Sequence, residues 1–292
     1  MNWHIGTAGW SYKDWEGSIY PKSKKAGSDY LEYYAQLFSV VEVNATYYSY
    51  LNPDYALSWV KKTADNQEFV FTIKLHQDFT HKRHYSSQNV KSVRSLFDNL
   101  SGEGKLGGVL IQFPYSFVKN HDNARYVNDL DALFNEYRLF YEFRHKSWFC
   151  ELPLLLTSGR QINVCSIDQP VIGEALPFNV QTVIRDGYVR LHGRNKPAWE
   201  ESIKKFSQNL QMKDPNARYH YYYSPSEMQE IRLKIEKKAE NATGDVFVIF
   251  NNHPFGYAPA NALELKILLE SLKPEIPMHI ALNFPRLAGL IK

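Results

Sequence analysis

The chain of 292 residues has only two cysteines, Cys150 and Cys165, and neither belongs to a paired zinc-binding spacing. Sparse cysteine excludes a disulfide framework and fits a reducing compartment, so we expect a cytoplasmic protein. The sequence also lacks a basic and apolar leader, because its first residues already read as a strand. No apolar run approaches the roughly eighteen residues of a membrane helix, so no membrane partner is expected.

An excess of charge of one sign is absent as well. The 34 Lys and Arg residues face 31 Asp and Glu residues, which leaves a net charge of +3. This balance argues against bulk binding to nucleic acid, so any preference for anions must be local. The sequence has no P-loop, dinucleotide fingerprint, nucleophile elbow or zinc-protease helix motif, and those chemistries therefore lose their usual support.

What the sequence does contain is a repeated alternation of strand-like and helix-like segments. The predicted strands are Trp3–Ala8, Val40–Thr46, Phe69–Leu75, Gly108–Phe113, Leu139–Phe143, Asn163–Ile167, Tyr188–Leu191 and Val246–Phe250. Helices are predicted to begin at Asp29, Asn52-Pro53-Asp54 and Ser87, and to cover Tyr126–Phe134, Leu152–Ser158, Ser224 to about Ala239, and Ala260–Leu272. Eight such alternations favour a (β/α)8 barrel of the TIM type over an open sheet.

Two connections depart from this regular pattern. No helix is evident in Gln169–Val183, so the sixth helix is expected to be short or missing. About fifty residues separate the seventh strand from the eighth, which predicts an insertion there. The sequence shows no linker, repeat or low-complexity segment. We therefore expect one α/β domain that spans residues 1–292.

Polar residues follow nearly every predicted strand, at the end where the active sites of such barrels lie. Period-two alternation places Arg190, His192 and Arg194 on one face of a strand, and such a face is costly in a packed core. These residues are therefore expected to point into a wet pocket. The predicted catalytic residues are Glu42, Glu142, Asp168 and His192. The predicted substrate-binding residues are Trp10, Tyr12, Asn44, Lys74, His76, Gln112, Arg144, Trp148, Arg190, Arg194, Asn251, Asn252 and Asn261.

Several of these residues have a structural interpretation beside the functional one. Glu142 and Arg144 share a face, and an ion pair that holds the barrel mouth together is as reasonable as a catalytic role. For His76 and His81 a hydrogen-bonded loop histidine is favoured over catalysis. The positive charges beside His192 favour its neutral form, which suits a general base or a hydrogen-bond donor to an oxyanion.

An anion site is predicted where the eighth strand leads into the last helix. Phosphate sites in these barrels often lie after the seventh and eighth strands, at a helix N-terminus. Arg190, Arg194 and Lys196 would supply charge, and the backbone from Gly256 to Asn261 would supply donors. Glu42, His76, Glu142, Asp168 and His192 offer oxygen and nitrogen ligands for a divalent metal. The lysine and arginines at the same mouth would repel it, so we expect neither a metal nor another cofactor.

Six ordered motifs are similar to those of a known family. They are Gly6 to Tyr12, Val41 to Tyr48, Gln112 to Pro114, Glu142 to Trp148, Tyr188 to Arg194, and Phe250 to Asn252. Together they resemble the YecE-like family, which is catalogued as domain of unknown function seventy-two. The resemblance covers nearly the whole chain and implies a TIM-type barrel, but it supplies no reaction. Two positions depart from the pattern, since Ser is more usual at Ala8 and Asp is more usual at His253.

Three classes of function are consistent with this mouth. We favour an enzyme, such as a hydrolase, lyase or isomerase, that acts on a phosphorylated or otherwise anionic small molecule by acid–base catalysis. The alternative is a protein that binds or processes nucleic acid, with bases stacked on Trp10, Tyr12, Tyr48 and Trp148. The third class is a binding module without catalysis. A closed basic pocket would favour a small substrate, and a wider basic rim would favour nucleic acid.

Overall fold

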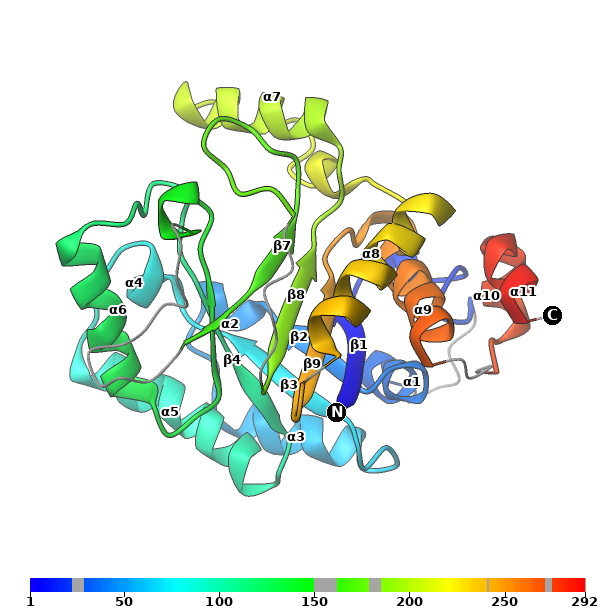
Figure 1. Cartoon of the computed structure of the whole chain (residues 1–292). Helices are drawn as coiled ribbons and strands as arrows, with labels where there is room; N and C mark the ends of the chain where they lie inside the picture. The colour runs from blue at the N-terminus through cyan, green and yellow to red at the C-terminus, as the bar shows by residue number, and fades with distance from the viewer. Residues whose placement is uncertain (23–28, 150–161, 179–184, 241, 271–274, 292) are drawn as a thin grey trace.

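The computed structural model of the chain describes residues 1–22, 29–149, 162–178, 185–240, 242–270 and 275–291 (Figure 1). In this part of the chain the strands are β1 (Asn2–Ala8), β2 (Val40–Val43), β3 (Val70–Lys74), β4 (Leu106–Gln112), β5 (Leu139–Glu142), β6 (Asn163–Val164), β7 (Ser166–Asp168), β8 (Gly187–Leu191) and β9 (Asp245–Phe250). All pairs of neighbouring strands among the described residues are parallel. Parallel pairing throughout agrees with the predicted alternation of strands and crossovers.

Helices cover the outside of this sheet. The α-helices are α1 (Tyr30–Leu37), α2 (Ala45–Tyr48), α3 (Asp54–Lys62), α4 (Gln77–Thr80), α5 (Ser87–Gly102), α6 (His121–Phe134), α7 (Lys196–Ser207), α8 (Pro225–Ala239), α9 (Tyr257–Glu270), α10 (Met278–Asn283) and α11 (Pro285–Ile291). Short 3-10 helices are η1 (Lys13–Trp15), η2 (Lys146–Phe149), η3 (Ala217–Tyr219) and η4 (Pro254–Gly256). Figure 1 shows α7 above the sheet, on the side away from the N-terminus. None of the described helices is long and apolar enough to span a membrane.

The sheet is a nearly closed barrel. Its strand order is β6-β5-β4-β3-β2-β1-β9-β8-β7, so the two end strands are consecutive in the chain and are separated only by Cys165. On one side the Cys165 amide donates to the Tyr141 carbonyl oxygen at 2.8 Å, and on the other Ser166 pairs with Val189. The described part of the chain thus has nine strands instead of the eight predicted, because the segment expected as one sixth strand divides at Cys165.

The local signals in the sequence agree with most helix starts. The Leu31 amide donates to the Asp29 side chain at 2.7 Å, and Ser224 and Glu227 form the predicted capping box of α8. The cap of α5 is Ser86, one residue before the predicted start. Strand β2 ends at Val43, earlier than predicted, because α2 begins at once. The predicted helix Leu152–Ser158 lies outside the described residues.

The two connections predicted to be irregular are those before and after β8. Between β8 and β9 the chain forms α7, η3 and α8, which agrees with an insertion. Between β7 and β8 no helix occurs in residues 169–178 or 185–186, while the end of the predicted gap, residues 179–183, lies outside the described residues. Helices α10 and α11 follow α9 and were not predicted.

Two apolar clusters stabilise the barrel. The larger lies between sheet and helices. The smaller consists of Ala8, Val40, Leu110, Phe140, Cys165, Ile167, Tyr188, Phe247 and Ile249. The Tyr188 hydroxyl lies 2.7 Å from Thr72 Oγ1, although β8 and β3 are not neighbours in the sheet. This contact crosses the barrel, so the smaller cluster fills its interior. Above it, toward the carboxyl ends of the strands, the interior becomes polar.

The contact between β1 and β2 generates a test of the fold. A Cβ atom on Gly6 would lie 2.0 Å from the Val40 carbonyl oxygen, which is also held by the Tyr34 hydroxyl at 3.0 Å. Because this backbone oxygen cannot move away, we expect Gly6→Ala to lower the free energy of unfolding by about 3 kcal/mol, measured by urea denaturation. Gly102→Ala is the control, since no atom lies within 4 Å of its added Cβ. If both variants unfold at the same urea concentration, the strand contact is wrong.

Candidate active site

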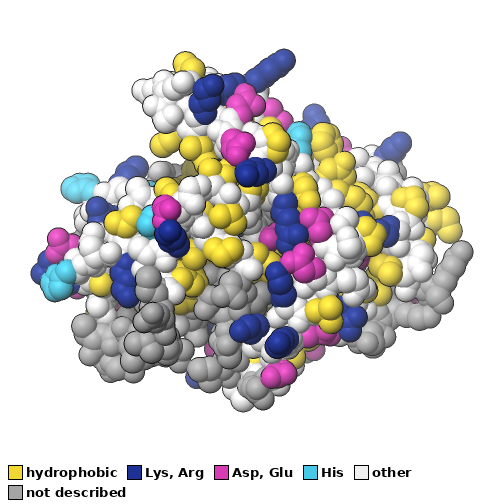
Figure 2. All heavy atoms as spheres, turned by 45° about the horizontal axis from the view of Figure 1, so that its top comes forward, with side chains coloured by type: hydrophobic (Ala, Val, Ile, Leu, Met, Phe, Trp, Pro, Cys, Tyr) yellow, Lys and Arg dark blue, Asp and Glu magenta, His cyan; other side chains and the backbone are white. Residues whose placement is uncertain are grey.

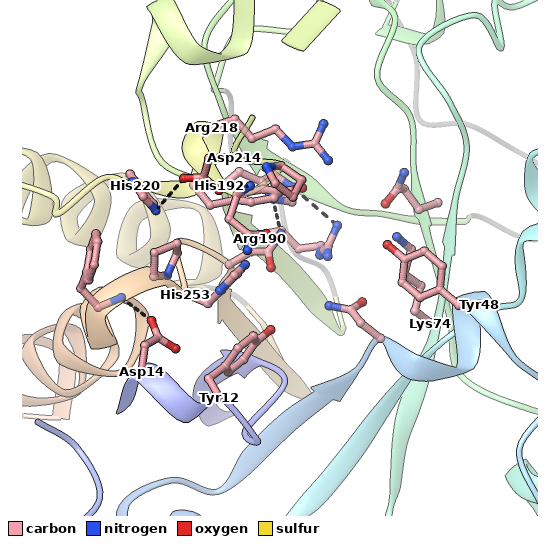
Figure 3. Close-up of a pocket in the computed structure, with 18 of the residues that line it drawn as sticks. Tyr12, Asp14, Tyr48, Lys74, Arg190, His192, Asp214, Arg218, His220 and His253 are labelled. Atoms are coloured by element: carbon pink, nitrogen blue, oxygen red, sulfur yellow. Dashed lines mark hydrogen bonds and ion pairs between the residues drawn. The ribbon is translucent and has the colours of Figure 1, made fainter. Parts of the chain in front are cut away.

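A cavity of about 510 Å³ opens at the carboxyl ends of the strands. Seven of its lining residues end or follow seven different strands: Tyr12, Asn44, Lys74, Gln112, Arg144, His192 and Asn251. All seven belong to the set predicted from the sequence, and Arg190 also lines the cavity. Figure 3 shows Arg190 and His192 in the centre, Tyr12 and Asp14 on one side, and Lys74 with Tyr48 on another. The polar strand ends therefore meet in one place.

Arg190 is the centre of the polar network beneath this cavity. Its side chain is 1% exposed, and the carboxylates of Glu42 and Glu142 are fully buried. The guanidinium donates to both oxygens of Glu42, from Nε at 2.9 Å and from Nη2 at 2.6 Å. Its Nη1 donates to Glu142 Oε2 at 2.6 Å. The contacts join β8 to β2 and β5, so they cross the barrel interior.

Arg144 extends the network from β5 to the cavity. Its Nε donates to Glu142 Oε1 at 2.8 Å, and its Nη1 donates to Gln169 Oε1 at 2.9 Å. Burial alone would raise the pKa of Glu142, but Arg190 and Arg144 outweigh it and hold the pKa well below its usual range. Glu142 is therefore a fixed carboxylate, and the geometry supports the ion-pair interpretation of Glu142 and Arg144.

His192 is held in its neutral form. Burial, then the charges of Arg190 and Arg144, lower its pKa well below the ordinary value. Its Nε2 lies 3.3 Å from Arg144 Nη2 and 3.5 Å from Arg190 Nη1, so Nε2 faces donors and must be the acceptor. Its other ring nitrogen, Nδ1, lies 3.0 Å from Nδ2 of the Asn251 side-chain amide. His192 is thus a poor proton acceptor for a ligand.

Lys74 is a lining residue whose pKa is lowered toward neutrality. It is half-buried at the end of β3, and its Nζ lies 4.1 Å from the centre of the Tyr47 ring. Burial and the charge of Arg190 lower the pKa of Lys74 to about 7, although Glu142 and Glu42 partly oppose this. Because two guanidinium groups balance two carboxylates beneath the cavity, the protonation of Lys74 sets the net charge of the cavity floor.

The insertion between β8 and β9 supplies a wall of the cavity that the sequence analysis missed. Its lining residues are Asp214, Pro215, Asn216, Arg218, Tyr219 and His220. The side chain of Asn195, just before α7, donates to the Ala217 and His220 carbonyl oxygens at 3.0 and 3.3 Å and so holds this segment. The run Arg218-Tyr219-His220-Tyr221-Tyr222-Tyr223 was an available signal, because it concentrates aromatic and basic residues in the longest connection. Asp14, Tyr48, His253, Pro254 and Phe255 also line the cavity.

The structure places some predicted site residues outside the cavity. Arg194 donates to both oxygens of Asp168 at 3.0 Å and also contacts Glu227 and Glu230. The other Asp168 partner is the Tyr223 hydroxyl at 2.6 Å. Asp168 and Arg194 therefore form a separate network that attaches the insertion to β7.

Other predicted residues have structural partners. The imidazole of His76 accepts from the Asp78 amide at 3.2 Å and stacks on Tyr50. Trp148 is buried against Phe143 and donates to the Phe117 carbonyl oxygen at 2.7 Å. The remaining three residues are Trp10, which packs on Trp59, and Asn252 and Asn261, which bond one another at 3.0 Å.

Near the anion site predicted around the start of α9, the predicted cations Arg194 and Lys196 lie beside carboxylates. The Phe255 amide, just before the predicted backbone donors, is bonded to Asp14 Oδ2 at 2.7 Å. Arg194 is neutralised by three carboxylates, and Lys196 lies on the exposed start of α7 near Glu200. The cations that face the cavity are instead Lys74, Arg144, Arg190 and Arg218.

The residues considered for a metal are engaged with N–H donors. The carboxylates of Glu42 and Glu142 bond arginines, that of Asp168 bonds Arg194, and Nε2 of His192 faces two guanidinium groups. Across the described residues no group of three or more His, Cys, Asp or Glu side chains is arranged to hold a metal ion. The donor set at the centre of the site therefore fits an arginine and not a divalent cation.

The central network predicts a stability change with a defined pH dependence. Arg190→Met leaves two buried carboxylates without their shared cation, so we expect the free energy of unfolding at about pH 7 to fall by about 3–5 kcal/mol. In the parent, the lowered pKa of Glu142 contributes stability that is lost as pH falls through the acid range. In the variant only Arg144 is left to oppose burial, so the pKa of Glu142 should be lowered less, and the loss of stability with falling pH should be smaller than in the parent. Urea denaturation across this pH range measures both.

The control for this test is the triple variant Glu42→Gln, Glu142→Gln and Arg190→Met, which removes both charges together with the cation. It should recover part of the lost stability and should lose the pH dependence. If Arg190→Met is as stable as the parent at about pH 7, the buried ion network is not what holds the barrel interior.

The comparisons with known proteins agree with this architecture. Residues 4–281 match the family described as "Protein of unknown function DUF72". "UPF0759 protein YunF" of Bacillus subtilis is 30% identical over 288 residues, which are 91% of this chain and 94% of that protein. A DUF72 family protein of Thermotoga maritima has a similar structure, with a TM-score of 0.74, 28% identity and coverage of 92% and 99% of the two chains. One of Enterococcus faecalis has a TM-score of 0.73, 23% identity and coverage of 92% and 96%. The predicted YecE-like resemblance is thereby confirmed, and the chain belongs to the DUF72 family.

Proposed function

We propose that this protein is an enzyme that binds an anionic small molecule, with a phosphate or carboxylate group, in the cavity at the barrel mouth. The observation that carries the proposal is the pairing of charges around the cavity. The carboxylates of Glu42 and Glu142 are already ion-paired with Arg190 and Arg144. Lys74 and Arg218 have no carboxylate partner in the part of the chain that the structure describes, and both line the cavity. A ligand anion would complete this arrangement.

Arg218 is positioned for such a ligand by aromatic packing. Its guanidinium lies 5.3 Å from the Trp199 ring centre and 4.8 Å from the Tyr219 ring centre. Its buried Nε has no hydrogen-bond partner within the described residues. Stacking fixes the guanidinium plane without neutralising it, so its N–H groups remain available for bidentate contact with a phosphate or carboxylate.

The remaining walls fit a small ligand that also has hydroxyl groups. Tyr12 and His253 stack at 4.5 Å, and Tyr219 lies beside His253. The side-chain oxygen of Asn44, another lining residue, is buried without a partner among the described residues. It can accept a hydrogen bond from a ligand hydroxyl or amine. A cavity of about 510 Å³ has the size of an ordinary metabolite site.

The nucleic-acid alternative is less well supported by the surface around the mouth. The cavity lining includes the carboxylates of Asp14 and Asp214 besides its cations. On the face drawn in Figure 2, acidic and basic side chains are interspersed. Tight binding to a phosphate backbone calls for a continuous basic surface wider than the mouth. Of the residues expected to stack bases, Trp148 is buried and Trp10 is partly buried against Trp59.

Arg218→Ala tests the proposed anion site. Loss of one charge-assisted contact should weaken binding by about 1.5–3 kcal/mol, or roughly tenfold to a hundredfold in affinity. The measurement is calorimetry with phosphate, sulfate, sugar phosphates and short oligonucleotides. Arg125→Ala is the matched control, because Arg125 is exposed on α6, away from the cavity lining, and its ion pair is with Asp122. Binding of oligonucleotides alone, or equal affinities in both variants, would contradict the proposal.

The lowered pKa of Lys74 predicts how anion binding changes with pH. Below its pKa of about 7 the amine is charged, and above it the cavity floor loses its net positive charge. The affinity for sulfate, which does not titrate in this range, should therefore fall by about tenfold or more between about pH 6 and about pH 8.5. Calorimetry across this range measures it. Lys74→Arg keeps the charge, so its affinity should stay constant, and a variant that follows the parent would remove Lys74 from the site.

A further inference from the structure

We infer that Lys74 is a nucleophile whose amine forms an imine with the carbonyl carbon of an anionic aldehyde or ketone held in the cavity. This inference rests on the proposed anion-binding function and specifies the class of its substrate. It assigns Lys74 a covalent role, beyond the binding role expected from the sequence.

The position of Lys74 suits this role. It is the last residue of β3, at the end of the barrel where the cavity opens, and it lines that cavity. The short helix α2 passes beside it, because Thr46 Oγ1 donates to the Lys74 carbonyl oxygen at 2.8 Å. The Tyr47 ring in the same helix covers the amine at 4.1 Å. Backbone and amine are therefore both held by neighbouring elements, which directs Nζ into the cavity.

The surroundings leave the amine unpaired by a carboxylate. The charged and titratable groups around it are Glu42 of β2, Tyr47 of α2, His81 after α4, Glu142 of β5, Arg144, Arg190 of β8 and His192. Both glutamates bond arginines at 2.6 to 2.9 Å. Burial raises the pKa of Tyr47 to about 12 and, together with Lys74, lowers that of His81 to about 4, so both are neutral at pH 7. The cationic neighbours favour the neutral, nucleophilic form of the amine.

The reaction balances without an additional reagent. The nitrogen lone pair attacks the carbonyl carbon and forms a C–N bond, while the carbonyl oxygen gains a proton. The nitrogen gives up its two protons in total, and the oxygen leaves with them as water, so a C=N bond remains. Protonation of this imine gives an iminium that withdraws electrons from bonds at the adjacent carbon. The class of reaction is therefore the making or breaking of a bond next to a carbonyl group, as in a lyase or an isomerase.

A second buried lysine provides an internal control. The amine of Lys105 donates to the Asn66 and Gln67 carbonyl oxygens at 3.2 and 2.7 Å. Lys105 precedes β4, at the opposite end of the barrel from the cavity. Burial also lowers the pKa of Lys105. A comparison between Lys74 and Lys105 therefore separates access to the cavity from burial as such.

The test is reductive trapping of the full-length protein with cyanoborohydride at about pH 7, followed by digestion and mass spectrometry. Two probes are used, formaldehyde for the bare reactivity of each amine and dihydroxyacetone phosphate for an anionic ketone. At this pH about half of Lys74 is neutral, against roughly one part in a few thousand of an ordinary lysine. Both probes should modify Lys74 at least about tenfold faster than Lys105 and the surface lysines. After reduction, the ketone should increase the mass of the modified lysine by the mass of the probe minus one oxygen atom.

Glycerol 3-phosphate, which has no carbonyl group, completes the design. It should slow the trapping of dihydroxyacetone phosphate at Lys74, and it should still stabilise Lys74→Arg against heat, because that variant keeps the charge. The inference is overturned if Lys74 reacts no faster than Lys105 with either probe. It is also overturned if Lys74 reacts no faster than Lys105 with formaldehyde alone. Stabilisation by glycerol 3-phosphate in that case leaves the anion-binding proposal standing, whereas its absence removes both.

Discussion

The site depends on one buried guanidinium. Arg190 bonds a carboxylate from β2 and another from β5, and these strands lie on different sides of the barrel. Burying any one of these charges alone would cost several kcal/mol, so each is tolerable only because the others are present. The same contacts fix the lower boundary of the cavity and lower the basicity of Glu142 and His192. The network that stabilises the interior thus also keeps Glu142 ionised and His192 neutral, so neither is suited to acid–base catalysis.

In the function proposed above, covalent chemistry belongs to a group at the edge of this network. Burial and the charge of Arg190 lower the pKa of Lys74 to about 7, and no hydrogen bond joins Lys74 to either glutamate among the described residues. Arg218 also lines the cavity and belongs to the insertion between β8 and β9. The barrel strands thus supply Lys74, while the added segment supplies a further cation. This division fits the general pattern in which loops on a rigid barrel determine which ligand is bound.

Much of this arrangement could be predicted from the sequence, because it depends on local rules. The alternation of strand-like and helix-like segments predicted the barrel. The polar strand ends predicted eight residues that do line one cavity: Tyr12, Asn44, Lys74, Gln112, Arg144, Arg190, His192 and Asn251. Alternation along a strand does not show which carboxylate meets which guanidinium, since such pairing depends on the twist and closure of the whole sheet. Alternation predicted one strand face for Arg190 and Arg194, but β8 ends at Leu191, and Arg194 beyond it turns to Asp168. Arg218 was missed because its loop has no periodicity that could place it.

The cross-barrel contacts of Arg190 also order the events of chain synthesis. Glu42 and Glu142 emerge from the ribosome before β8, so the growing chain contains both carboxylates before their common counter-charge exists. A fragment that stops short of β8 contains Arg144 for Glu142 but lacks the arginine that Glu42 bonds, so burial of the Glu42 carboxylate in such a fragment would be costly. The final polar interior is thus available only after β8 has been made.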